Sequence, residues 1–225
     1  LMKEKVGKTN KGTDAVIFNE WYELQDLMSS NSGIISPNKF VYHVQELAKE
    51  KNKDLFTGWS QNDMPEYLLF MMECIHNSIS RRVKMTILGK ERTTTDKMAV
   101  ACYEMLRSVF EKEYSEILEL FYATYVSEII SMDGKTTYTM KPELFFILDL
   151  PIPSEHHIPN INLYDCFELF LKPEILEGEN AWLNEATGKK EDIQKRMSFW
   201  NLPKVLVITL KRTCPFGQNK LRTNV

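Results

Sequence analysis

The chain has 225 residues, of which 43% are hydrophobic, and this is enough for one large domain or two small subdomains with cores of their own. Its net charge of −3 and its pI near 5.9 argue against nucleic-acid binding, which usually needs a strongly basic face. No apolar run approaches the roughly 18 residues of a membrane span, and the polar start of the chain lacks a signal-peptide pattern. The chain begins at Leu1, and we expect it to be a piece of something longer.

The first half of the sequence predicts helices. Residues 19–28 form the first, with one apolar face made of Trp21, Leu24, Leu27 and Met28. Ser36 and Pro37 are typical of a helix start, as N-cap and first helical residue. The helix that follows has an apolar stripe made of Phe40, Val44, Leu47 and Ala48.

Asp63 is predicted to cap the next helix, because its carboxylate can accept free N–H groups of the first turn. Pro65 is tolerated in that turn, and Glu66 completes a pattern like a capping box. We expect this helix to be mostly buried, through Leu68, Leu69, Met71, Met72, Ile75 and Ile79. A polar connection over residues 81–92 then leads to a helix capped by Thr95 or Asp96, which runs to Phe110.

The second half predicts strands. Residues 122–130 and 135–140 are expected to pair around an Asp133-Gly134 hairpin, with a third strand over residues 144–152. Residues 162–171 predict a short helix, residues 187–190 a turn, and residues 205–210 a buried strand. Helices followed by an antiparallel sheet indicate the α+β class.

Four scattered cysteines, Cys74, Cys102, Cys166 and Cys214, form no C-x-x-C pair. Their small number favours a reducing compartment, and we expect the protein in the cytoplasm or the nucleus. Cys74 and Cys102 are interpreted as buried apolar residues of helices, and Cys214 as an exposed thiol.

Two stretches of the sequence carry a family resemblance, one over residues 56–70 and one over residues 202–212. They resemble paired landmarks of the ubiquitin-specific proteases, which are papain-like cysteine deubiquitinases. Further stretches match in order, over residues 18–28, 99–104, 114–121, 146–153, 162–170 and 178–182. The resemblance implies the hand-like papain fold, with a helical thumb over residues 1–118, and antiparallel β fingers and the start of the palm over residues 119–225. These would form one incomplete catalytic domain.

Three departures limit what the resemblance implies. The family's Cys box should precede Phe18, where no Cys stands, and its His box belongs beyond Val225. Many members bind zinc at the fingertips through two C-x-x-C pairs, but those positions here are Ile130/Asp133 and Asn184/Thr187. Without thiolates, tight tetrahedral zinc is not expected, and we predict no metal and no other cofactor.

Thiol proteolysis needs a thiolate within hydrogen-bond reach of an imidazole. Cys74 and His76 lie two residues apart on one predicted helix, so their side chains diverge. We therefore identify no catalytic residue, and we expect this chain alone not to cleave ubiquitin.

Residues that grip the substrate can still be predicted. By the resemblance, Gln61 and Asp63 match the family positions where the Asp binds the ubiquitin tail. Asp63 can instead be a plain helix cap, and both roles can coexist. Trp59 and Phe56 flank this loop, and either line the substrate channel or pack into the core.

The resemblance leaves three functions open. The first is the ubiquitin-recognising portion of a deubiquitinase. The second is a non-catalytic ubiquitin-binding or scaffolding module, and the third is a structural component of a larger assembly. Ubiquitin or its conjugates is the expected partner in the first two, with neither nucleic acid nor membrane.

Overall fold

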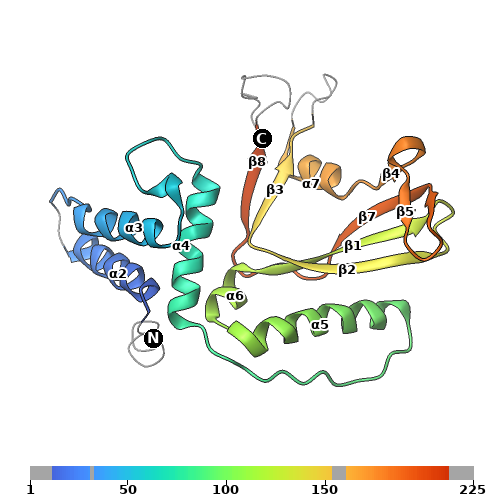
Figure 1. Cartoon of the computed structure of the whole chain (residues 1–225), viewed down its shortest axis with the longest axis horizontal. Helices are drawn as coiled ribbons and strands as arrows, with labels where there is room; N and C mark the ends of the chain where they lie inside the picture. Colours follow the sequence, from blue (N-terminus) through green and yellow to red (C-terminus); the bar gives the residue numbers. More distant parts are fainter. Residues whose placement is uncertain (1–11, 31–32, 154–160, 213–225) are drawn as a thin grey trace. The chain divides into compact units, whose positions relative to one another are not determined.

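The computed structural model describes residues 12–30, 33–153 and 161–212. These residues form two compact units (Figure 1). The first runs up to Met85 and includes Ser108–Leu120, and the second combines Thr86–Arg107 with the chain from Phe121 on. Thr86–Arg107 thus groups with the strands. Within that group, the Tyr103 ring meets the Trp200 ring edge-on, with centroids 5.9 Å apart.

The first unit is helical. It contains α2 (Asp14–Ser30), α3 (Asn38–Glu50), a 3-10 turn η1 (Asp54–Phe56), α4 (Met64–Ile79), α6 (Glu116–Phe121) and the last turns of α5 (Thr94–Glu113). Helix α2 packs against both α3 and α4. The core between them is made of Ile17, Val44, Leu47, Ala48, Phe56, Phe70, Met71 and Cys74. The apolar stripe predicted on α3 is confirmed, because three of its four residues are buried and Phe40 is half-buried.

The predicted apolar face of α2 is wrong. Trp21, Leu27 and Met28 are 38%, 49% and 56% exposed, whereas Ile17 and Phe18 are buried. The helix begins at Asp14, and its buried residues lie in the turns that directly follow this start. Because apolar residues occur on several sides of this helix, periodicity alone does not select the side that packs.

The predicted helix starts at Ser36 and at Thr95 or Asp96 are also corrected. Pro37 occupies the N-cap position of α3 and no side chain caps that end. At the start of α5, Thr93 Oγ1 accepts the Asp96 N–H at 3.1 Å and Asp96 Oδ2 accepts the Thr93 N–H at 2.8 Å. Thr93 is therefore the cap of α5, and Asp96 is the third residue of a reciprocal capping box.

The second unit is built on a four-stranded antiparallel sheet of order β2-β1-β7-β4 (Figure 1). Its strands are β1 (Ala123–Ser131), β2 (Thr137–Phe145), β7 (Ile193–Phe199) and β4 (Glu174–Leu176). The predicted Asp133-Gly134 hairpin is confirmed, with Gly134 at a positive φ of 72° that favours glycine. A separate hairpin joins β5 (Trp182–Asn184) to β6 (Lys189–Glu191), after a 3-10 turn η2 (Gly178–Asn180).

The strand predicted over residues 144–152 is divided. Phe145 ends β2, and β3 (Ile147–Pro151) pairs with β8 (Val207–Lys211) in a parallel arrangement. The strands are therefore not all antiparallel. Helix α7 (Leu163–Leu171) packs against β3 and β7 over a core of Ala123, Phe145, Leu148, Leu150, Ile152 and Cys166. The α+β class predicted from the sequence is confirmed.

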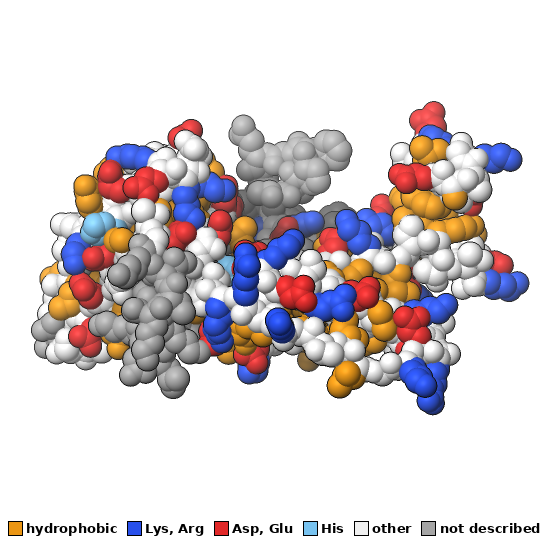
Figure 2. Space-filling model, turned by 60° about the horizontal axis from the view of Figure 1, so that its bottom comes forward, with side chains coloured by type: hydrophobic (Ala, Val, Ile, Leu, Met, Phe, Trp, Pro, Cys, Tyr) orange, Lys and Arg blue, Asp and Glu red, His pale blue; other side chains and the backbone are white. Residues whose placement is uncertain are grey.

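The surface carries charges of both signs. Lys and Arg side chains are interspersed with Asp and Glu over the face shown in Figure 2. Among the described residues, no helix has the length and apolar character needed to cross a membrane.

Candidate functional site: the loop before helix α4

The loop between η1 and α4 is anchored by one buried aromatic side chain. Phe56 is 4% exposed, and its ring lies 5.6 Å from the Tyr67 ring and 5.2 Å from the Phe70 ring. Gln45 of α3 donates a hydrogen bond from Nε2 to the Gly58 carbonyl at 3.2 Å. The base of the loop is therefore fixed to the helical core, and Phe56 supports the loop from inside the protein.

The residues that follow Phe56 are presented to solvent. Trp59 is 84% exposed, and Gln61 and Asp63 are exposed as well. An aromatic side chain with this exposed fraction does not pack against the described residues, so it is available to bind a partner. The structure thus separates the two aromatic candidates, with Phe56 in the core and Trp59 on the surface.

Asp63 caps helix α4, as predicted. Its Oδ1 atom accepts the Glu66 N–H at 3.0 Å, and its carbonyl accepts the Tyr67 N–H at 3.1 Å. Because the carboxylate is exposed, its second oxygen can accept a donor from a partner while the cap persists.

Asn62, which the sequence analysis did not single out, has an unusual environment. Its Oδ1 atom is buried and accepts no hydrogen bond from the described residues. An unpaired buried acceptor is unfavourable unless a ligand or a water molecule supplies a donor. The loop therefore carries a buried, unpaired amide oxygen at Asn62 next in sequence to the exposed carboxylate of Asp63.

The described thiols are unsuited to nucleophilic attack. Cys74 is fully buried, and burial, with Asp14 as the next cause, raises its pKa to about 12. Burial raises the pKa of Cys102 to about 11 and that of Cys166 above its usual value. The predicted burial of Cys74 and Cys102 is confirmed, whereas Cys214, His156 and His157 lie outside the described residues.

His76 is committed to a structural contact. Its Nδ1 atom lies 2.7 Å from the Ser115 hydroxyl, which also accepts the Ile117 N–H at 3.2 Å. Burial lowers the pKa of His76, against the opposing charges of Glu113 and Glu73.

We expect the helical unit to lose stability as the pH falls below about 6.5, the ordinary pKa of histidine. The pKa of His76 is lower in the folded protein than in the unfolded chain, so the unfolded chain binds the proton more tightly. The stability of the fold with neutral His76 is therefore fully present only above about pH 6.5 and falls as the pH is lowered. Urea denaturation at pH values from 5 to 8 measures the slope, and His76→Gln should flatten it below about pH 6.5. Identical slopes for parent and variant would contradict the assignment.

At the four fingertip positions where zinc-binding members have thiolates, the side chains of this chain make polar and apolar contacts instead. Ile130 is buried in β1, and Asp133 accepts hydrogen bonds from the Ser131 hydroxyl and the Lys135 N–H. Asn184 and Thr187 both donate to Glu191. Among the described residues, no cluster of three or more His, Cys, Asp or Glu side chains could hold a metal ion.

This arrangement of helices, loop and sheet fits the α+β, papain-like fold of the ubiquitin-specific proteases, and comparison with known proteins identifies the family. The profile of the ubiquitin carboxyl-terminal hydrolase family matches residues 2–225. The chain therefore belongs to this family.

Individual proteins that are similar to this chain are also ubiquitin carboxyl-terminal hydrolases. Over 201 residues the chain is 31% identical to human ubiquitin carboxyl-terminal hydrolase 2, covering 87% of this chain and 31% of that protein. It is 26% identical over 216 residues to the chicken protein of the same name, covering 92% and 56%. It is 29% identical over 185 residues to ubiquitin carboxyl-terminal hydrolase 4 of Saccharomyces cerevisiae strain YJM789, covering 79% and 19%. The chain thus spans about a third of the human relative's length and half of the chicken relative's.

Proposed function

We propose that this chain is the ubiquitin-recognising portion of a deubiquitinase, a cysteine-type isopeptidase that cleaves after the C-terminal glycine of ubiquitin. The observation that carries the proposal is the loop over residues 59–63, which is anchored to the core yet presents the side chains of Trp59, Gln61 and Asp63 to solvent. This loop stands in the register of the family's tail-binding loop. The catalytic Cys and His are assigned to none of the described residues.

The loop has the chemistry that an extended, arginine-bearing tail requires. Asp63 offers an exposed carboxylate oxygen to a guanidinium group. Gln61 can donate and accept toward a peptide backbone. Trp59 supplies exposed aromatic surface, and Phe56 holds the loop from beneath.

We extend the proposal to the folded body of ubiquitin, which the sheet would contact. One face of the sheet has the half-buried side chains of Ser127 and Ile129 of β1 beside Met197 of β7. Mixed apolar and polar surface of this kind is typical of protein interfaces. Because the three described cysteines are free thiols, we also propose a reducing compartment, the cytoplasm or nucleus, as its location.

Asp63→Asn should weaken ubiquitin binding about ten-fold and leave thermal stability nearly unchanged. Asparagine caps a helix about as well as aspartate, but it lacks the charge, and a hydrogen bond to a charged group contributes about 1.5–3 kcal/mol. Asp63→Ala should lose binding and also about 1 kcal/mol of stability, because the cap is removed. Calorimetric titration with full-length ubiquitin and with ubiquitin lacking its tail measures both effects.

Ubiquitin that lacks its tail is the control, because the affinity of the chain for it should not depend on Asp63. If Asp63→Asn binds full-length ubiquitin as tightly as the parent, Asp63 is a helix cap only. A parent chain that binds neither form of ubiquitin would overturn the proposed function itself.

The alternative is a non-catalytic ubiquitin-binding or scaffolding module, alone or within a larger assembly. What favours it is that the fingertip positions Ile130/Asp133 and Asn184/Thr187 lack the thiolates of the zinc-binding family members. Both functions require the same binding loop, so titration alone does not separate them. The flanking coding sequence does, since a Cys box upstream and a Gly-His-Tyr box downstream decide for the enzyme.

A further inference from the structure

We propose that the backbone edge formed by Arg82 and Lys84 is a docking site, where an extended, acidic segment of a partner protein pairs as an added β-strand. These residues belong to the polar connection that follows α4, over residues 81–92. They stand at the opposite end of α4 from the loop that carries Asp63, and the inference does not depend on the proposed function.

Hydrogen bonds on the other edge, the inner edge, hold this segment extended. Arg81 and Tyr114 exchange two backbone hydrogen bonds, in which the Arg81 N–H donates at 2.8 Å and the Tyr114 N–H donates at 2.7 Å. Two residues further along, the Val83 N–H donates to the Phe110 carbonyl at 2.9 Å. Backbone donors two residues apart that point the same way are the pattern of a β-strand. The inner edge is therefore already paired.

Side chains reinforce the inner edge. The Arg81 guanidinium donates to both carboxylate oxygens of Glu116, at 3.0 and 2.8 Å, and lies 4.8 Å from the centroid of the Tyr114 ring. The Tyr114 hydroxyl donates in turn to Glu119 at 3.0 Å. The carboxylates of Glu116 and Glu119 are thus engaged on the inner edge. The segment is also held in place without a partner, which lowers the entropic cost of binding one.

The outer edge is formed by Arg82 and Lys84. In an extended chain the N–H and C=O groups of successive residues point to opposite edges, so those of Arg82 and Lys84 point away from Tyr114 and Phe110. Among the described residues, neither Arg82 nor Lys84 has a backbone hydrogen-bond partner. An unpaired edge of this kind is a template for pairing with another chain.

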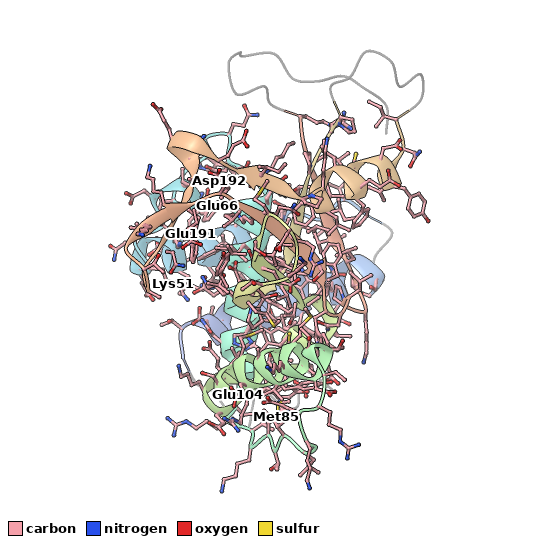
Figure 3. All side chains as sticks on the ribbon, turned by 90° about the vertical axis from the view of Figure 1, so that its right-hand side faces the viewer. Lys51, Glu66, Met85, Glu104, Glu191 and Asp192 are labelled. Carbon is pink, nitrogen blue, oxygen red and sulfur yellow. The ribbon has the colours of Figure 1, made fainter. Side chains whose placement is uncertain are left out.

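The charge of the segment selects the occupant. Arg82 and Lys84 are exposed and have no ion pair among the described residues, whereas Arg81, Val83 and Met85 are half-buried. Figure 3 labels Met85 on this segment, and side chains that end in nitrogen project outward around it. The same edge of a second copy would place like charges opposite each other, which is destabilising. A strand that carries Asp or Glu instead brings opposite charges together, so the outer edge suits an acidic segment.

A peptide titration tests strand addition. The probe is a short, end-blocked, fluorescent peptide of alternating Glu and Val, which should bind the 225-residue chain saturably with a Kd below about 1 mM. The same peptide with every amide N-methylated should bind at least about ten-fold more weakly, because its backbone donors are lost. Absence of binding by the unmodified peptide would overturn the proposal. Equal binding of the methylated peptide would show attraction by charge alone and would overturn the strand pairing.

A charge reversal locates the site. Arg82→Glu combined with Lys84→Glu should weaken the peptide at least about ten-fold, and should leave thermal stability nearly unchanged because both side chains are exposed. Lys172→Glu combined with Lys204→Glu is the matched control, since it changes the net charge equally at two other exposed cations, and it should bind like the parent. An equal loss of affinity in both variants would reduce the effect to net charge and overturn the site.

Hydrogen exchange of the parent chain reads the edge directly and needs no variant. In the free chain the amides of Arg82 and Lys84 should exchange faster than those of Arg81 and Val83, which are already hydrogen-bonded. Saturation with the peptide should slow Arg82 and Lys84 at least about ten-fold and leave Arg81 and Val83 nearly unchanged. Peptide binding without slower exchange at Arg82 and Lys84 would overturn the proposal.

Discussion

Phe56→Ala is expected to lower the free energy of unfolding by about 3 kcal/mol, the low end of the range for a buried aromatic residue. The Phe56 side chain is 4% exposed and contacts the rings of Tyr67 and Phe70, so its removal leaves a cavity in the helical core. Urea denaturation of the 225-residue chain measures the loss.

Trp59→Ala is the matched control for Phe56. The Trp59 side chain is 84% exposed, so its truncation should change stability by no more than about 0.5 kcal/mol. Under the proposed function it should instead reduce the affinity for ubiquitin, measured where both variants are folded. A Phe56→Ala variant with near-parent stability but weaker binding would reverse the roles assigned to the two side chains.

Arg196→Ala should cost about 3 kcal/mol of stability, because it leaves the Glu128 carboxylate buried without its partner. Glu128 is 2% exposed, and Arg196 of β7 donates to its Oε2 from Nε at 3.1 Å and from Nη2 at 2.8 Å. The two residues are cross-strand partners, with Met140 opposite Glu128 on the other neighbouring strand. We expect the low end of the range for broken buried pairs because the Arg196 side chain is 48% exposed, so water reaches the site.

A double-mutant cycle separates the ion pair from other losses. Glu128→Gln in the Arg196→Ala background should recover at least about 1 kcal/mol, because a neutral amide is less costly to bury than an unpaired carboxylate. Lys195→Ala, the neighbouring cation on the opposite face of β7, should change stability by about 0.5 kcal/mol or less. Equal losses for Lys195→Ala and Arg196→Ala would show that the buried pair contributes nothing specific.

Features decided by local chemistry could be predicted from the sequence. The Asp133-Gly134 turn follows from the positive φ that glycine tolerates, and the Asp63 cap follows from the free N–H groups of a helix start. The apolar stripe of α3 was also predictable, because only one side of that helix is apolar.

Features that depend on distant partners could not be predicted. The burial of Ile17 and the exposure of Trp21 depend on where α3 and α4 pack against α2. Leu69 was predicted in the buried set of α4, yet it is 44% exposed. The parallel pairing of β3 with β8 joins strands that are separated in the chain by α7, β4, the β5–β6 hairpin and β7, and no local pattern specifies such a partner.

The candidate site divides in the same way. The sequence by itself predicted the family and the α+β class, and it located the loop that carries Gln61 and Asp63, because these rest on motifs and local capping. The contact of that loop with ubiquitin stays a prediction. Only the tertiary structure decided that Phe56 packs while Trp59 is presented, since burial depends on what the rest of the chain places around a side chain. It alone also placed the Tyr138 ring of β2 against the Trp182 ring of β5, because contacts between hairpins depend on long-range register.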